Sequence, residues 1–299
     1  MTESGILVMN KPQGFTSFDV IGRLRGILKM KRLGHTGTLD PMATGVLPVL
    51  VGRATRACDM LPDETKCYRA AFQLGAVTDT QDSTGRILET HPVDVTAVQI
   101  EAALPGFTGD LMQVPPMYSA VQVNGKRLYE LARAGREIER PARHVHVERF
   151  ALTAYDEITG AGEAEIRCGK GTYVRTLLHD LGQALGCGCM MTALTRTEAC
   201  GFTLAQSYTF EQVQQAAEAG DIDSLMIPTD ALFQALPALR LTQVQTVHYL
   251  NGVRLSLSAL PQSAQQSASG LRVYGADGRF LGIARADEAA QALRIMKNL

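Results

Sequence analysis

The chain has 299 residues, of which 45% are hydrophobic and 20% are charged, and its formal net charge is −1. This composition is typical of a soluble globular protein with one large domain or two, and no apolar run approaches the roughly 18 residues of a membrane span. The N-terminal segment has no basic stretch leading into a long apolar one, so we expect no secretory signal. We therefore predict a cytoplasmic protein whose six cysteines are reduced thiols.

The charges are unevenly distributed along the chain. Residues 1–60, 111–149 and 238–299 carry net charges of +4, +3 and +4, whereas residues 61–110 and 150–237 carry −5 and −7. A polyanion could bind where the basic segments meet. Ordinary variation of surface charge explains these counts equally well.

The first predicted elements are a strand and a helix. The apolar run at 6–9 predicts a short buried strand that ends in a turn. Thr16 or Ser17 can cap a following helix, whose apolar face comprises Val20, Ile21, Leu24, Ile27 and Leu28. The helix runs into a basic stretch without acids, which suits either a solvated face or the negative end of a helix dipole.

The pattern beyond residue 32 mixes strands and helices without a regular βαβ repeat. A glycine-rich stretch at 33–47 can hold neither a long helix nor a central strand. We then predict strands at 46–52, 67–75, 144–155 and 164–169, helices at 54–61, 96–107 and 172–186, and a strand, an Asn-Gly turn and a basic helix within 117–138. This mixture favours the α+β class.

A change in composition near Leu236-Pro237 predicts a domain boundary. We expect one large domain at 1–237 and a small β-rich domain at 238–299, with a helix at 242–252 and strands around 271–284. The Gln/Ser-rich stretch at 261–270 is predicted to be a mobile loop that is too polar to pack.

Several common catalytic motifs are missing from the sequence. It contains no Walker A sequence, no HExxH, no GxSxG and no dinucleotide-binding fingerprint. The cysteines and histidines lack the spacing of a metal site. We therefore expect neither a cofactor nor a metal, and a reaction that uses side chains alone.

Asp40 lies within the glycine-rich stretch, directly before Pro41. Proline disfavours helical backbone at the preceding residue, so Asp40 is expected to be extended and to project from its turn. From these residues alone, an Asx-turn or a helix cap is the more common reason for such an aspartate. His35, in the same stretch, is on this basis an ordinary hydrogen-bonding residue.

Four segments together resemble the motifs of one enzyme family. They are NKPQGFTS (10–17), GHTGTLDPMATGVLPVLVGRATR (34–56), KCYRAAFQLGAVTDTQDSTG (66–85) and GKGTYVRTLLHDLG (169–182). In this order they resemble the TruB family of pseudouridine synthases. PPMYSAVQVNGKRLYELARAG (115–135) resembles that family's RNA-clasping insertion, placed here at 110–148. GADGRFLGIA (275–284) resembles a PUA domain, although roughly 60 residues is short for one.

The resemblance implies an activity, a fold and site residues. It implies isomerisation of uridine to pseudouridine at position 55, in the T-arm of tRNA, by an α+β protein with a mixed sheet core, a central cleft and a PUA-like RNA-binding domain. Asp40 matches the catalytic aspartate, His35 an RNA contact near the extruded base, and Tyr68 the tyrosine that stacks on uracil. Arg175 matches the arginine that pairs with the catalytic carboxylate, and Leu194 an apolar wall. Lys11 and Pro12 match a supporting motif and are excluded from catalysis.

The implied reaction needs one ionised carboxylate and no cofactor. Asp40 could attack C1′, attack C6 or help to form a glycal, and the sequence does not choose among these routes. Phosphate contacts are predicted for a set of basic residues: Arg23, Arg25, Lys29, Lys31, Arg32, Lys126 and Arg127. The expected partner is tRNA, with no membrane and no obligate protein partner.

Two alternatives remain open. The first is a member of the same superfamily that acts on another RNA, including a guide-dependent one. The second is a noncatalytic RNA-binding or RNA-remodelling protein, which would need no Asp40–Arg175 pair.

Overall fold

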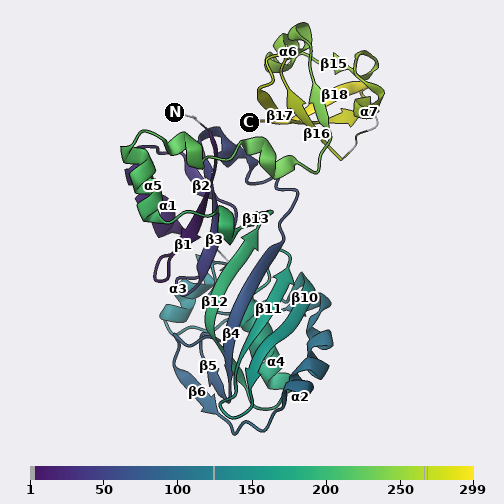
Figure 1. The fold of residues 1–299 in the computed structure, drawn as a ribbon. Coiled ribbons are helices and arrows are strands. Elements are labelled where there is room, and N and C mark those ends of the chain that lie inside the picture. The colour runs from purple at the N-terminus through teal and green to yellow at the C-terminus, as the bar shows by residue number, and fades with distance from the viewer. Residues whose placement is uncertain (1–3, 124, 266, 268) are drawn as a thin grey trace.

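The computed structural model describes residues 4–123, 125–265, 267 and 269–299. In this part of the chain, one large mixed sheet forms the body of the protein and a smaller sheet forms its C-terminal part (Figure 1). The α+β prediction is therefore confirmed. Asn124 of the predicted Asn-Gly turn lies outside the described residues.

The large sheet follows the order β1-β3-β12-β4-β11-β10-β7, with β2 paired to β3 and β13 paired to β12. Its strands are β1 (Gly5–Lys11), β2 (Leu33–His35), β3 (Thr44–Val51), β4 (Lys66–Leu74), β7 (Gly109–Gln113), β10 (Arg143–Asp156), β11 (Ala161–Cys168), β12 (Cys189–Ala199) and β13 (Phe202–Thr203). Two hairpins, β5 (Ala76–Thr78) with β6 (Ile87–Thr90) and β8 (Gln122–Val123) with β9 (Lys126–Arg127), stand apart from it.

The helices of the body are α1 (Ser17–Leu28), α2 (Ala97–Ala103), α3 (Leu128–Arg133), α4 (Val174–Ala184) and α5 (Phe210–Glu218). Short 3-10 helices are η1 (Gly52–Ala57), η2 (Leu104–Phe107), η3 (Leu204–Gln206), η4 (Ile222–Leu225) and η5 (Thr229–Phe233). The prediction of α1 is confirmed, including its N-terminal cap. The side chain of Thr16 accepts a hydrogen bond from Asp19 N, and the side chain of Asp19 accepts one from Thr16 N.

One face of the sheet is covered by helices. The side chains of β4 alternate, so that Tyr68, Phe72 and Leu74 are buried while Arg69 between them is exposed. The buried side packs against α4 and α2, which Figure 1 shows lying against the strands β10, β11, β4 and β12.

The first half of the body joins the second through a short parallel contact. Strands β3 and β12 pair in parallel over Thr44↔Thr195 and Gly45↔Arg196, whereas all other neighbouring strands in the order given above are antiparallel. The glycine-rich stretch reaches β3 at this point. The contact therefore places the loop that carries Asp40 beside β12.

The small sheet, ordered β14-β16-β17-β18-β15, has its own apolar core. Its elements are β14 (Ala238–Arg240), α6 (Gln243–Leu250), β15 (Leu255–Ser256), η6 (Leu257–Ala259), α7 (Gln262–Gln265), β16 (Leu271–Tyr274), β17 (Phe280–Asp287) and β18 (Ala292–Asn298). The prediction that 261–270 is too polar to pack is wrong for α7, because Ala264 is 2% exposed within this core. The small apolar side chain, not the average polarity, anchors the segment.

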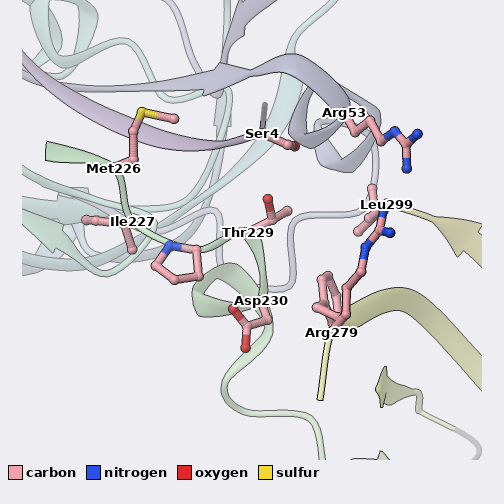
Figure 2. Close-up of a pocket in the computed structure, with 10 residues that line it drawn as sticks. Ser4, Arg53, Met226, Ile227, Thr229, Asp230, Arg279 and Leu299 are labelled. Atoms are coloured by element: carbon pink, nitrogen blue, oxygen red, sulfur yellow. The ribbon is translucent and has the colours of Figure 1, made fainter. Parts of the chain in front are cut away.

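Polar and aromatic contacts join the two parts. Tyr274 donates a hydrogen bond to Asp230 (2.7 Å), and Lys297 Nζ lies 2.6 Å from Asp59 Oδ2. A pocket of about 400 Å³ opens at this junction, and Figure 2 shows Arg53 and Arg279 lining it from the two sides. It shares no lining residue with the pocket around Asp40.

The joint between β3 and β12 depends on Gly45. Its φ is +102°, and a Cβ atom there would overlap the carbonyl group of Arg196. We expect Gly45→Ala to lower the free energy of unfolding by about 2–4 kcal/mol, measured by urea denaturation. Gly22→Ala in α1, where a Cβ meets nothing within 4 Å, should instead raise it by about 0.5–1 kcal/mol. Equal effects of the two changes would contradict this account.

Candidate active site

A pocket of about 530 Å³ opens where the Asp40 loop meets β4, β12 and the start of α4. Residues 36–40 form one side of it, and Glu64, Lys66 and residues 169–172 form another. Tyr68, Met191 and Leu194 contribute apolar surface. The pocket gathers segments that are more than 150 residues apart in sequence, from Thr36 to Leu194.

Asp40 and Arg175 form an ion pair in this pocket. Arg175 Nη2 lies 2.8 Å from Asp40 Oδ2, and the side chains of Arg175 and Asp40 are 5% and 35% exposed. The aspartate therefore engages the arginine that the family motif indicated. Its carboxylate also keeps one open side, which faces the pocket that Asp40 lines.

Asp82 is a second carboxylate on the same arginine, and the sequence analysis missed it. Its Oδ2 lies 3.4 Å from Arg175 Nη1, and its Oδ1 accepts hydrogen bonds from Thr80 Oγ1 (2.8 Å) and Thr84 N (3.0 Å). Arg175 also donates to the carbonyl group of Tyr118 (3.0 Å). The guanidinium is thus held from several directions, and its orientation toward Asp40 is set in advance.

Burial governs the ionisation of Asp40. Loss of solvent raises the pKa of its carboxyl group above the ordinary value, and the nearby charge of Asp82 adds to this. Arg175 and Lys11 act in the opposite direction, because a positive charge favours the ionised form. The net result is a raised pKa for Asp40.

Lys11 supports the Asp40 loop from beneath. Its side chain is fully buried, and its Nζ donates to the carbonyl groups of Pro12 (3.0 Å), Phe15 (2.5 Å) and Pro41 (3.4 Å). Burial lowers the pKa of Lys11 to about 8. These contacts agree with a supporting role and keep Lys11 outside the lining of the pocket.

Arg196 of β12 holds the other side of the loop, and the sequence analysis missed it as well. Its side chain is 0% exposed, and it donates to the carbonyl groups of Val46 (2.7 Å), Gly37 (3.1 Å) and Thr38 (3.5 Å). The guanidinium uses a different nitrogen for each of the three carbonyl groups, which its planar fork of five donors allows.

Tyr68 and Leu194 lie where the family motifs placed them, on the lining of the pocket. Tyr68 is 6% exposed, and burial raises the pKa of its hydroxyl group to about 12. His35, in contrast, pairs through β2 with Val49 and does not line the pocket. Burial and the charge of Arg196 lower the pKa of His35, which favours its neutral form.

None of the predicted phosphate contacts lines the pocket. Several make local contacts: Arg23 lies 4.2 Å above the ring of Phe210, Arg32 donates to Thr55 Oγ1 (2.8 Å), and Arg25 donates to Lys31 O (3.2 Å). Lys126 and Arg127 form β9 and are exposed. Their roles in binding stay predictions.

The described residues show neither a group of side chains suited to a metal ion nor a helix suited to a membrane. No group of three or more His, Cys, Asp or Glu side chains is arranged to hold a metal ion. No helix in the described ranges is both long enough and apolar enough to cross a membrane.

Models of known protein families match three consecutive parts of the chain. The family model described as TruB family pseudouridylate synthase (N terminal domain) matches residues 25–174. The tRNA pseudouridylate synthase B C-terminal domain model matches 175–234, and the Pseudouridine synthase II TruB, C-terminal model matches 237–292.

Two full-length relatives and one solved structure extend this result. The tRNA pseudouridine synthase B of Stutzerimonas stutzeri (strain A1501) is 41% identical over 288 residues, covering 95% of this chain and 92% of the relative. That of Burkholderia lata is 43% identical over 283 residues, covering 94% and 86%. A chain from a Cbf5-Nop10-Gar1 complex superposes with a TM-score of 0.75 at 22% identity, over 99% of this chain and 85% of that one, which shows a shared fold.

The ion pair makes a prediction about Asp40 that needs no knowledge of the reaction. In Arg175→Met, the partly buried carboxylate loses its nearest positive charge, so the pKa of Asp40 should rise further above its ordinary value. NMR titration of the labelled carboxyl carbon measures it. Arg149→Met removes an exposed ion pair with Glu165 and should leave the Asp40 titration unchanged. An unaltered Asp40 titration in Arg175→Met would refute the electrostatic role of the pair.

Proposed function

Because the chain belongs to the TruB family of pseudouridylate synthases, we propose that it converts uridine to pseudouridine at position 55 in the T-arm of tRNA. The observation that carries the proposal is the Asp40–Arg175 ion pair (2.8 Å) at a pocket with apolar walls. A carboxylate that is held in this way and open to the pocket can act on a sugar, which favours an enzyme over a protein that only binds RNA.

The chemistry requires few groups. The N1–C1′ bond breaks, the uracil turns, C5 bonds to C1′, and the hydrogen on C5 leaves as a proton while N1 takes up a proton from water. An ionised Asp40 beside the ribose can stabilise positive charge at C1′ or add to it, as carboxylates do in glycosidases. The routes through C1′, through C6 and through a glycal all place this carboxylate at the nucleotide, so the geometry is compatible with each.

The pocket also suits a flipped base. Extruding a stacked base costs a few kcal/mol, and stacking on an aromatic ring returns about 1–3 kcal/mol. Tyr68 supplies such a ring, and Leu194 and Met191 supply apolar surface beside it. Arg175 would act on the nucleotide through Asp40, because it orients that carboxylate.

The remaining roles follow from the family and are part of the proposal. Residues 110–148 would clasp the RNA, the part at 238–299 would bind RNA further along, and His35 would contact the RNA near the extruded base. The exposed basic side chains on and after α1 and on β9 would contact phosphates. We further propose that the protein works in the cytoplasm, where tRNA is modified.

Asp40→Asn tests the catalytic role directly. The carboxylate becomes a neutral amide of equal size, so we expect at least a 1,000-fold loss of tritium release from tRNA labelled at uridine C5, with tRNA binding retained within about 10-fold. Wild-type release should require a uridine at position 55. The measurements are the initial rate of tritium release and a filter-binding Kd.

Asp94→Asn is the matched control, since Asp94 is exposed and does not line the pocket. It should release tritium at the wild-type rate. Wild-type protein that binds tRNA tightly but releases no tritium would overturn the enzyme proposal and favour the RNA-binding alternative. Release that persists when position 55 is changed would indicate another target uridine.

The raised pKa of Asp40 predicts the acid side of the pH profile. The reaction uses the ionised form, so kcat should fall as the pH drops through the Asp40 pKa, with a midpoint above the ordinary value of 3.8. Single-turnover rates between pH 4 and 8, together with circular dichroism to verify folding, measure this midpoint. A rate that is constant down to pH 4 in folded protein would contradict the assignment.

A further inference from the structure

Lys66 is a buried cation on the wall of the catalytic pocket. It begins β4, is 9% exposed, and lines the pocket beside Glu64 and residues 169–172. Among the described residues, its Nζ donates one hydrogen bond, to the carbonyl group of Glu64 (2.7 Å). A lysine carries three donors, so two of them are left for a ligand in the pocket.

Arg196 adds a second buried positive charge directly behind this wall. A Cβ atom on Gly37 would meet Lys66 Cε at 3.3 Å and Arg196 Nη1 at 3.7 Å, so both cationic side chains pack on the same glycine. In the part of the chain that the structure describes, neither Lys66 nor Arg196 forms an ion pair, and both are held by backbone carbonyl groups. Arg196 together with burial lowers the pKa of Lys66.

Buried charges without counter-charges are costly, because the interior does not solvate them as water does. Asp40 and Asp82 are already engaged with Arg175. Glu64 is engaged with Lys170, whose Nζ lies 2.8 Å from Glu64 Oε2 at the rim of the pocket. The pocket wall at Lys66 therefore carries more positive than negative charge, and an anionic ligand would compensate this difference.

The position of the wall indicates which anion fits. The apolar residues Tyr68, Met191 and Leu194 suit the uncharged base. Lys66 lies instead beside Gly169, Lys170 and Gly171, a segment that leads through Thr172 to the N-terminal end of α4. Backbone amides that precede a helix are favourable for phosphate, and a nucleotide whose base enters the pocket keeps its phosphates at the rim.

We propose that Lys66, with the segment 169–172, binds a phosphate group that flanks the flipped uridine. This rests on the proposed function, since the ligand is the backbone of the RNA substrate. Lys66 then holds the nucleotide at its phosphate while Tyr68 and Leu194 hold its base. The ribose is thereby positioned over Asp40, and Lys66 is a substrate-positioning residue that touches no reacting atom.

A chemical cycle tests this contact. T-arm hairpins carry a neutral methylphosphonate at the phosphate 5′ or 3′ to the target uridine, and filter binding gives Kd with Asp40→Asn protein, in which turnover does not interfere. With Lys66 present, one of the two substitutions should weaken binding about 10-fold, because it removes a charge-assisted contact. The Asp40→Asn, Lys66→Met double variant should bind unmodified RNA about 10-fold more weakly than Asp40→Asn protein does. In this double variant, the same methylphosphonate should cause no further loss of affinity.

Three further proteins make the result specific. Lys66→Arg keeps the charge and should restore most of the affinity and of the sensitivity to the methylphosphonate. Arg149→Met removes an exposed cation of β10 that does not line the pocket, and this variant should remain fully sensitive to the methylphosphonate. If Lys66→Met fails to fold by circular dichroism, Lys66→Gln takes its place, because its amide can still donate a hydrogen bond.

Two outcomes would overturn the proposal. In the first, the protein with Lys66→Met or Lys66→Gln loses as much affinity on methylphosphonate substitution as the Asp40→Asn protein with Lys66 does. In the second, the affinity of the Asp40→Asn protein with Lys66 does not change when either phosphate is replaced. Failure of the proposed function is a separate result, because it would appear as absent tritium release from unmodified tRNA by wild-type protein, whatever these affinities are.

Discussion

A buried guanidinium that must be compensated organises this protein. Arg175 lies in the first turn of α4 and is buried, so an unpaired charge there would be strongly destabilising. Asp82 and Asp40 compensate it from two different segments, the turn after β5 and the loop before β3. Three parts of the chain that are distant in sequence are thereby held around one side chain. The carboxylate of Asp40 is oriented by the same contact that makes the burial of Arg175 tolerable.

Two other buried cations, Lys11 and Arg196, are stabilised in a different way, without a carboxylate partner among the described residues. Lys11 and Arg196 are satisfied by backbone carbonyl groups on both sides of the Asp40 loop, and these bonds fix the course of a segment that has little regular structure. Carbonyl groups carry no net charge, so the positive field of both cations persists in the interior. The pocket is consequently cationic beside the open carboxylate of Asp40, although the whole chain has a net charge of −1. The local positive charge of the pocket attracts an RNA backbone, even though the net charge of the whole chain is slightly negative.

Local patterns predicted the elements that local interactions determine. The helix capped by Thr16, the alternating strand β4 and the amphipathic helix α4 follow from periodicity and capping, and the family motif indicated the pairing of Asp40 with Arg175. The central strand β12 was not predicted, because two bulges interrupt its alternation and its buried arginine has the sequence signature of a surface residue. Asp82 was missed for a related reason. Its turn is polar, and its burial depends on Arg175, a residue 93 positions away.

The bulges of β12 and the buried position of Arg196 together constrain how this strand can pair during folding. The ladder with β3 spans two residue pairs, too few to select one alignment by hydrogen bonding alone. A slip of one residue would turn the guanidinium to the opposite face of the sheet and bring Thr195 or Thr197 inward in its place. The carbonyl groups of Gly37, Thr38 and Val46 would then lose their donor at the same time. The contacts of Arg196 therefore favour the observed alignment of β12 with β3 and link it to the course of the loop at Asp40.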